Sequence, residues 1–552
     1  MKRYLIASLS LIFAQSVLNT PLKEEDTHPS HLSHGEVSEA KRRILAPAYG
    51  NMRIYVDFTA ADKIYGVPTS NWSSLYVASK QNVIQASIFH SLVHNIINPT
   101  PTITFADISD KSTGTTFAVK GQTVPYDLYV MFLVFVNDSD TTLAWAASAE
   151  TNTTTGRPIS GKFALNMAKV KPGAYGNILG FGTYVHEFYH ILAMNSPLYP
   201  TYIDANGQAL GDAIIGTTTI LTKPGTTFKG ANTVQYVKTY LNDPSVTDVP
   251  FEVANAAAGG GSAGAHWEYI YWPSDFMSST DTVPNLYTNL SWSMSRDTGW
   301  YTVNWQFAAD PLYGKGVTGF QSGSCPTASA PGFCASTDSG NELCGLDYTY
   351  KGSCGQNDPY SLTCYFLKGS VDCTVNDSSF LKNTNSFGAR FDLAFETYGA
   401  GSRCGLLTIS GNTQAQCGLA SCDANGAATW QYQGVSCTCS STATAGTAGT
   451  CTNSSISIKC PLVSDFCNTL KPGNRCPNDC SSRGVCVGPL GNRQCFCMYG
   501  YTGYNCNTTN PSQGPVSGSA PPNGASNSGS VTVYVQLMSL LIGLSISIGI
   551  LI

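Results

Sequence analysis

One short run in the chain has the residue types and spacing of a metal site that activates water: His186-Glu187-Phe188-Tyr189-His190. On an α-helix, positions i and i+4 lie on one face, so the imidazoles of His186 and His190 can bind the same ion. Glu187 lies beside that ion, where its carboxylate can take a proton from water that the ion polarises. The run therefore predicts a zinc-dependent hydrolytic site in which Glu187 is the general base.

The third ligand is predicted from how few histidines the chain contains. Only eight occur in 552 residues, and none lies beyond His266. A catalytic zinc usually takes three protein ligands and leaves one position for water. His266 is the leading candidate, because a glycine-rich run just before it lets the backbone bend sharply. Glu268 and Glu252 are the alternatives, since some zinc sites use a glutamate as the third ligand.

The other five histidines are assigned no catalytic role. His90 and His94 have the i, i+4 spacing of a metal pair, but no acidic residue adjoins either of them. We interpret this pair as part of a helix face. His28, His31 and His34 lie in a polar N-terminal stretch that we interpret as a removable segment.

The elements that position these residues are predicted from hydrophobic periodicity. The apolar, helix-forming segments 82–97 and 183–194 are expected to be helices. Strands are expected around Val56 and over 128–136 and 163–170, where residues are apolar or alternate. Mixed elements of this kind predict an α+β fold.

Past His266 the chain reaches Met277 within Ser274-Asp275-Phe276-Met277-Ser278. With these residues the chain resembles the leishmanolysin-like zinc metallopeptidases, family M8 of the metzincin clan. Members share a helix with two histidines and a glutamate, a third histidine delayed by an insertion, and a methionine turn beneath the zinc. The segment 51–58 also resembles the first strand of that family.

The resemblance implies an α+β catalytic domain with an active-site helix and a methionine turn, which acts on proteins or peptides with one Zn²⁺. It places the zinc ligands at His186, His190 and His266, the general base at Glu187 and the structural methionine at Met277. Tyr269 or Tyr271 is a candidate donor to the developing oxyanion.

Two positions depart from the family pattern. Metzincins carry glycine three residues after the second histidine, where this chain has Ala193. Asparagine tolerates the left-handed conformation, so Asn195 is expected to end the helix instead. The propeptide cysteine that blocks the zinc in many members is missing, because no cysteine precedes Cys325.

The cysteines predict a secreted, disulfide-rich C-terminal half. All twenty lie between Cys325 and Cys506, which indicates an oxidising compartment. The last six resemble an EGF-like module in their spacing. That resemblance implies three bonds: Cys476–Cys486, Cys480–Cys495 and Cys497–Cys506.

The termini indicate the secretory pathway and a membrane anchor. A basic start and an apolar core over residues 1–16 predict a signal peptide. Seven N-x-S/T sequons agree with secretion. The uncharged apolar segment 531–552, after the polar stalk 508–530, favours a GPI signal over a single membrane-spanning helix. The enzyme is thus expected on the outer face of the plasma membrane.

The predicted organisation follows the chain in seven parts. They are a signal peptide (1–16), a pro-segment (17–43), a catalytic region (44–320, with an insertion at 191–265), a cysteine-rich domain (321–470), an EGF-like module (471–507), a stalk (508–530) and an anchor signal (531–552).

The sequence leaves two classes of function open. A net charge of −5, with no basic block past residues 41–43, argues against nucleic acid as a partner. The main hypothesis is a cell-surface zinc metalloendopeptidase. The alternative is a surface adhesion protein that binds a ligand through its EGF-like module and uses the peptidase fold only as a scaffold.

Overall fold

The catalytic part of the chain is built on a twisted sheet of four strands in the order β2-β8-β10-β9. β2 (Ile54–Asp57), β8 (Leu128–Phe135) and β10 (Pro158–Asn166) are parallel, while β9 (Ala144–Thr151) runs antiparallel to β10 and forms the edge. β8 is buried on both faces, as its unbroken apolar run requires in a parallel sheet. The three predicted strands are thus present, although β10 begins and ends earlier than expected.

The computed structural model describes residues 49–510, with the exception of 66–72, 98, 100–101, 105–108, 111–114, 117–122, 140–141, 171–172, 221–222, 254–261, 281–282, 322–324, 329, 357–363 and 377–395. The signal peptide, the pro-segment with His28, His31 and His34, the stalk and the apolar segment 531–552 were predicted from sequence, and they lie outside the described residues. Among the helices that are described, none combines the length and apolar character needed to cross a membrane.

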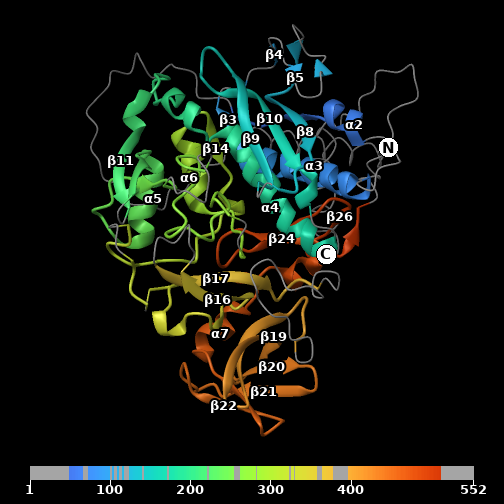
Figure 1. Cartoon of the computed structure of the whole chain (residues 1–552), viewed down its shortest axis with the longest axis vertical. Coiled ribbons are helices and arrows are strands. Elements are labelled where there is room, and N and C mark those ends of the chain that lie inside the picture. The colour runs from blue at the N-terminus through green and yellow to red at the C-terminus, as the bar shows by residue number, and fades with distance from the viewer. Residues whose placement is uncertain are drawn as a thin grey trace, which may run out of the picture. The chain divides into compact units, whose positions relative to one another are not determined.

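Two long helices pack against each other in the catalytic region, α3 (Ser73–Val93) and α4 (Gly173–Leu192) (Figure 1). α4 also contacts the strands β9 and β10, and α3 contacts β2, so both helices pack against the sheet as well as against each other. Both helices begin about ten residues before the predicted starts. The first prediction was wrong at its other end, because His94 belongs to strand β3 (His94–Ile97), which pairs with β1 and β14.

The insertion after α4 folds into small elements that return the chain to the active-site helix. An antiparallel sheet of β11 (Ile215–Ile220), β12 (Lys223–Phe228) and β13 (Val249–Pro250) precedes His266. α5 (Ala231–Leu241) packs on α6 (Asn289–Asp297). Buried Asp297 joins them, because its carboxylate accepts hydrogen bonds from the first-turn amides of Asn232 and Thr233.

The remaining elements of the catalytic region are short. They are β1 (Tyr49–Asn51), α2 (Thr59–Tyr65), β4 (Ile103–Thr104), β5 (Ser109–Asp110), β6 (Thr115–Thr116), β7 (Thr123–Val124), η2 (Met167–Lys169), η3 (Ser196–Thr201), η4 (Gly211–Ile214), β14 (Tyr301–Val303) and η5 (Trp305–Phe307).

The cysteine-rich region consists of a three-stranded sheet and a closed barrel. The sheet contains β15 (Glu342–Cys344), β16 (Tyr350–Gln356) and β17 (Tyr365–Asp372), and it follows η6 (Ser336–Asp338). The barrel is formed by β18 (Ser402–Ile409), β19 (Asn412–Cys422), β20 (Ala428–Tyr432), β21 (Val435–Cys439), β22 (Ala448–Cys451) and β23 (Ile456–Lys459), and α7 (Val463–Thr469) follows it.

All twenty cysteines are paired, which confirms the prediction of disulfides. The seven bonds of the cysteine-rich region, whose pairing the sequence left open, are Cys325–Cys364, Cys334–Cys354, Cys344–Cys404, Cys373–Cys417, Cys422–Cys467, Cys437–Cys451 and Cys439–Cys460. Cys437–Cys451 links two barrel strands, and Cys344–Cys404 links the three-stranded sheet to the barrel.

The last described segment, residues 471–510, is called the C-terminal module. Its elements are η7 (Pro477–Ser482), β24 (Gly484–Val487), β25 (Gln494–Cys497), β26 (Tyr501–Thr502) and β27 (Thr508–Thr509). Its bonds are Cys476–Cys486, Cys480–Cys495 and Cys497–Cys506, the same pairs that the EGF resemblance implied. Two small hairpins, β24-β25 and β26-β27, carry these cysteines.

The C-terminal module packs into the catalytic core. The Phe496 ring lies 5.0 Å from Phe89 of α3 and 5.7 Å from Phe181 of α4, centroid to centroid. The amide of Gln85 on α3 donates a hydrogen bond to the carbonyl of Cys497. The described residues from Tyr49 to Asn510 accordingly belong to one compact unit.

Candidate active site

The three histidines predicted from sequence meet at one point. The Nε2 atoms of His186 and His190, both on α4, lie 3.0 Å apart. The Nε2 of His266, which follows the insertion, lies 3.1 Å from that of His186 and 3.2 Å from that of His190. In the part of the chain that the structure describes, Glu252 and Glu268 are not members of this cluster. The geometry therefore favours His266 over either glutamate as the third ligand.

A main-chain carbonyl fixes the tautomer of each ring. Nδ1 of His186 lies 2.7 Å from the carbonyl oxygen of Phe276, Nδ1 of His190 lies 2.7 Å from that of Met194, and Nδ1 of His266 lies 3.0 Å from that of Ser262. A carbonyl oxygen can only accept, so each Nδ1 carries a proton and donates it. Each Nε2 of a neutral ring then presents a lone pair to the centre of the cluster.

Burial keeps the rings neutral. Desolvation lowers the pKa of His190 to about 4 and that of His266 to about 3. The pKa of His186 lies well below its usual value for the same reason, and its two histidine neighbours lower it further. At neutral pH all three are thus unprotonated and able to bind a metal ion.

The cluster fits a zinc ion by the chemistry of its donors. Three lone pairs that face one another at 3.0–3.2 Å repel, and none of the three nitrogens can donate to another. A cation at their centre removes that repulsion. Tetrahedral zinc with bonds of 2.0–2.1 Å to nitrogen spaces its ligand atoms by about 3.3 Å, close to the separations observed.

The methionine turn holds the two halves of the cluster together. Its Phe276 carbonyl accepts from His186, and its Met277 carbonyl accepts from the amide of Trp267, the residue after His266. The Met277 side chain is fully buried in the main core cluster. This segment therefore links the active-site helix to the chain that carries the third histidine.

Asp275 organises this turn, although its sequence context predicted no role for it. Its Oδ1 accepts from the amide of Met277 and from the hydroxyl of Ser291, each at 2.7 Å, and its Oδ2 accepts from the hydroxyl of Thr288. Burial raises the pKa of Asp275 to about 7, while these donors favour the charged form. The available signal was an acidic residue inside the otherwise apolar segment around Met277.

The backbone around His266 pairs with the backbone of residues 250–252. The carbonyl of His266 accepts from the amide of Glu252, and the amide of Glu268 donates to the carbonyl of Pro250. Both glutamate side chains are buried, and the Oε2 of each accepts a main-chain amide, from Tyr269 and from Val253 respectively. The two carboxyl groups are thus part of the support of the loop, with raised pKa values caused by burial.

The end of α4 differs from the expectation for Asn195. The helix ends at Leu192, and Asn195 is extended with φ −144° instead of left-handed. The amide of Met194 donates to the carbonyl of Tyr189, and the carbonyl of Met194 accepts from His190. Ala193 is fully buried in this turn, so the exit from the helix is stabilised without glycine.

Three further predicted positions are placed as follows. Glu187 lies beside His186 on α4 and is 5 % exposed. Tyr269 is fully buried against Phe366, and Tyr271 is fully buried against Phe320. These positions do not support the predicted role of either tyrosine as a donor to the oxyanion.

His90 and His94 form a second, separate pair behind α4. Both are fully buried, and His90 Nε2 lies 3.0 Å from the carbonyl of Val185, one residue before His186. His94 bonds to the His90 carbonyl and to the hydroxyl of Ser295. The pair is therefore a packed support of the active-site helix, as the absence of neighbouring acids indicated.

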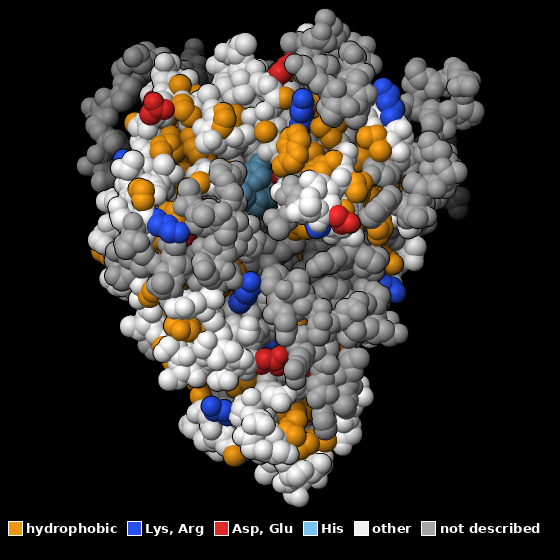
Figure 2. Space-filling view, in the orientation of Figure 1, with side chains coloured by type: hydrophobic (Ala, Val, Ile, Leu, Met, Phe, Trp, Pro, Cys, Tyr) orange, Lys and Arg blue, Asp and Glu red, His pale blue; other side chains and the backbone are white. Residues whose placement is uncertain are grey.

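The metal cluster opens to one face of the molecule. Figure 2 shows histidine surface at the bottom of a hollow that is flanked by hydrophobic side chains. Because His90 and His94 are fully buried, this surface belongs to the three converging histidines. A ligand can therefore reach the cluster from this face.

A helix with two histidines and a glutamate, a third histidine beyond an insertion, and a buried methionine turn together define a metallopeptidase type of site. The sequence profile of the leishmanolysin peptidase family matches residues 117–474. The chain therefore belongs to the leishmanolysin family.

The chain is similar to two proteins that are each named ciliated left-right organizer metallopeptidase. The relative from Danio rerio is 24 % identical over 313 residues, which cover 53 % of this chain and 46 % of the relative. The relative from Xenopus laevis is 24 % identical over 225 residues, which cover 38 % and 29 %. The chain thus matches less than half the length of either relative.

Proposed function

We propose that this protein is a zinc metalloendopeptidase of the metzincin type. The convergence of three neutral Nε2 donors beside Glu187 is the single observation that carries the proposal. His186, His190 and His266 would hold the zinc ion, and the buried Met277 would form the floor of the site.

The proposed reaction is the hydrolysis of a peptide bond. Zinc, when bound, supplies Lewis-acid polarisation of water and of the scissile carbonyl. Glu187 takes the proton from the attacking water and delivers it to the leaving amine, so the carboxylate is restored at the end of each turnover. The three carbonyl acceptors keep the imidazoles oriented and raise their basicity as ligands.

The edge strand β9 is proposed to bind the substrate. β9 pairs only with β10 among the described strands, and it contacts α4. An unpaired edge can add an extended peptide as a further strand through main-chain hydrogen bonds. To test this, alternate amides of a peptide substrate would be N-methylated; methylation at bonded positions should raise KM, and equal KM values at all positions would exclude strand addition.

The decisive test of the peptidase proposal compares wild type with Glu187→Ala and His266→Ala in a casein assay. Loss of a general base lowers kcat by about 10²- to 10⁴-fold. Glu187→Ala should keep its zinc, measured by metal analysis, whereas His266→Ala should lose it. Chelation should abolish wild-type activity and zinc should restore it. Equal activity in wild type and Glu187→Ala would contradict the proposal.

We propose that the enzyme acts on the outer face of the cell, held by a GPI lipid for which segment 531–552 is the attachment signal. The disulfides and the exposed sequon residues Asn137, Asn376, Asn453 and Asn507 support passage through the secretory pathway. Phosphatidylinositol-specific phospholipase C should release the protein from intact cells. Retention after this treatment would contradict the lipid anchor and favour a membrane-spanning segment.

A further inference from the structure

A cavity of about 300 Å³ lies where the catalytic region, the cysteine-rich sheet and the C-terminal module meet. We call it the junction cavity. Its lining includes the loop 283–287, residues near the ends of β15 and β17, and the segment 474–493 of the module. Gly182 of α4 also reaches it, four residues before the first metal ligand.

Arg493 gives the junction cavity a cationic wall. Its Nε is inaccessible to solvent and has no hydrogen-bond partner among the described residues. Its only direct side-chain bond there is from Nη1 to the sulfur of Cys486 at 3.9 Å, a weak acceptor. The charges of Asp347 and Asp310 act on the Arg493 guanidinium without forming an ion pair with it, and a carboxylate is the group that a guanidinium binds best.

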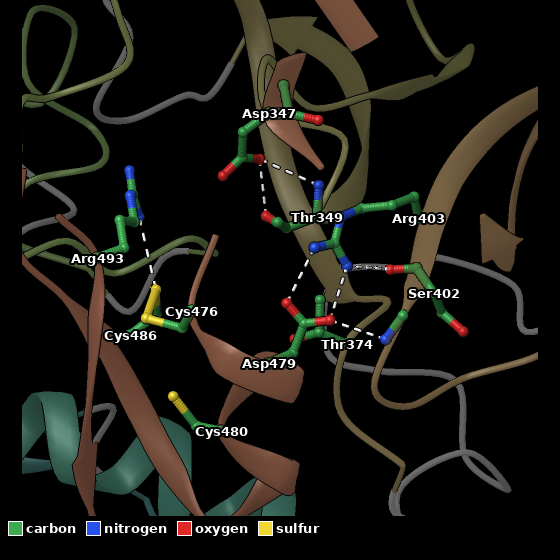
Figure 3. A network of polar contacts seen from close by, with 12 residues as sticks. Asp347, Thr349, Thr374, Ser402, Arg403, Cys476, Asp479, Cys480, Cys486 and Arg493 are labelled. Atoms are coloured by element: carbon green, nitrogen blue, oxygen red, sulfur yellow. Dashed lines mark hydrogen bonds and ion pairs between the residues drawn. A yellow bond between two sulfur atoms is a disulfide. The ribbon is translucent and has the colours of Figure 1, made fainter. Parts of the chain in front are cut away.

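Arg403, one of the two other arginines that line the junction cavity, is already paired. Arg403 forms a two-fold ion pair with Asp479, with its Nη atoms 2.9 and 3.0 Å from the two carboxylate oxygens (Figure 3). This pair fixes the module to the barrel strand β18. Arg403 is therefore already neutralised, whereas Arg493, which shares the lining with Arg475, forms no ion pair among the described residues.

Two carboxylates give the junction cavity an anionic wall. Asp347 Oδ1 accepts from the amide and the hydroxyl of Thr349, and Asp372 Oδ1 does the same with Thr374. The Oδ2 atom of each carboxylate takes no part in these hydrogen bonds. In Figure 3 the side chains of Asp347 and Arg493 are drawn above the Cys476–Cys486 disulfide, and no ion pair joins the two residues.

The space between the two walls is largely apolar. Its lining contains Val283, Leu286, Leu312, Leu346 and Val485. A simple anion in this space would face the two aspartates, and a metal cation would face the arginines. A ligand that carries both charges and an aliphatic body matches all three surfaces.

From this arrangement we propose that the junction cavity binds a free amino acid with an aliphatic side chain. Its carboxylate would pair with the Arg493 guanidinium, its ammonium group with the Asp347 carboxylate, and its side chain with the apolar lining. The site is distinct from the histidine cluster, and its occupancy does not depend on peptidase activity.

The test is calorimetric titration of L-leucine into the purified, folded chain. Leucine should bind, while 4-methylpentanoate, which lacks the ammonium group, and isopentylamine, which lacks the carboxylate, should each bind about tenfold more weakly or worse. Inorganic phosphate should not compete. Absence of leucine binding, or binding of phosphate as tight as that of leucine, would overturn the proposal.

Matched variants locate the site. Arg493→Gln and the isosteric Asp347→Asn should each weaken leucine binding about tenfold or more. Arg483→Gln is the control, because Arg483 is exposed on the same module and contacts the ring of Tyr501. Unchanged affinity in Arg493→Gln would contradict the assignment. If that variant fails to fold, Asp347→Asn and the three ligands on wild type still decide the question.

Discussion

The three imidazoles proposed to bind zinc are oriented by main-chain carbonyls, so the geometry of the cluster depends on where the backbone lies. His186 depends on the methionine turn, His190 on the end of its own helix, and His266 on the turn at Ser262. Side chains therefore act on the cluster indirectly, by fixing these backbone segments. Asp275 is the clearest case, because it bonds to the Met277 amide and to two hydroxyl groups.

Asp275→Asn should loosen the methionine turn. One oxygen of the carboxylate becomes an NH₂ group, which cannot accept, so the variant loses either the bond from Thr288 to Oδ2 or the bonds from Met277 and Ser291 to Oδ1. Removal of an outer-shell partner typically weakens metal binding by about 10- to 100-fold. The measurement is competition for zinc with a chelator of known affinity.

Asp297→Asn is the control for Asp275→Asn. Asp297 is also a buried carboxylate with several donors, but it caps α5 and does not bond to the turn. It should lower the melting temperature and leave zinc affinity unchanged. Equal zinc affinity in the two variants would contradict the prediction that Asp275 stabilises the zinc site.

The burial of His90 predicts that the folded protein loses stability in acid. Burial lowers its pKa to about 4, whereas an unfolded histidine titrates near 6.5. Between these values the unfolded chain binds a proton that the folded chain excludes, so the free energy of unfolding falls as the pH drops from 6.5 to 4. One histidine contributes at most about 1.4 kcal/mol per pH unit.

The measurement for His90 is urea denaturation at pH 7, 6 and 5 in wild type and His90→Gln. The glutamine amide can still donate to the Val185 carbonyl, and the slope of stability against pH should become shallower. Ser91→Ala is the control, because it removes the bond from Ser91 to the Met52 carbonyl without changing a titrating group. Identical slopes in wild type and His90→Gln would refute the role assigned to His90.

At the scale of the elements, the active-site helix is placed by its close contact with the sheet. Gly161 on β10 lies under Ile191 on α4, next to His190. A Cβ at Gly161 would lie 2.4–2.9 Å from three side-chain atoms of Ile191. Any larger residue at position 161 must therefore displace the Ile191 side chain, the helix or the strand.

Gly161→Ala should displace the C-terminal half of α4. Overpacking of this kind costs about 1–3 kcal/mol. The shift should also weaken zinc binding, because His190 adjoins the displaced residue. Thermal unfolding and zinc competition are the two measurements.

Gly355→Ala is the matched control for Gly161→Ala. Gly355 lies on β16, and a Cβ there would meet no atom within 4 Å. This variant should keep both the stability and the zinc affinity of wild type. Unchanged zinc affinity in Gly161→Ala would show that the helix does not depend on this contact.

At the scale of the whole molecule, the C-terminal module is a structural part of the catalytic region. Phe496 contacts α3 and α4 through Phe89 and Phe181, and the Arg403–Asp479 ion pair ties the module to the barrel. A freely hanging adhesion module would share no core with the peptidase. This packing weighs against the adhesion alternative.

Phe496→Ala should destabilise the whole chain by about 3–5 kcal/mol, because a large ring leaves a shared core. Calorimetry should show one unfolding transition that moves to lower temperature, with the loss of casein hydrolysis in parallel. Tyr504→Ala is the control, since Tyr504 is 77 % exposed on the same module. A separate transition for the module, with the peptidase transition unchanged, would contradict this coupling.

Several properties of this protein are determined by the sequence alone. Residues at positions i and i+4 lie on one face of any helix. His186, His190 and Glu187 could therefore be predicted as a candidate site without knowledge of the fold. The scarcity of histidine pointed to His266, and the number and density of cysteines predicted disulfides. The run 128–136 likewise predicted a strand, which the structure has as β8 (Leu128–Phe135).

Only the tertiary structure decided the features that depend on residues far apart in the chain. These are the approach of His266 across the insertion, the anchoring of the turn by Asp275, the pairing of fourteen cysteines and the packing of the C-terminal module. Local patterns do not encode such contacts, since each is selected by the folding of two segments against each other. Asn195 is a clear example, because tertiary packing around Met194 replaced the left-handed turn that its residue type favoured.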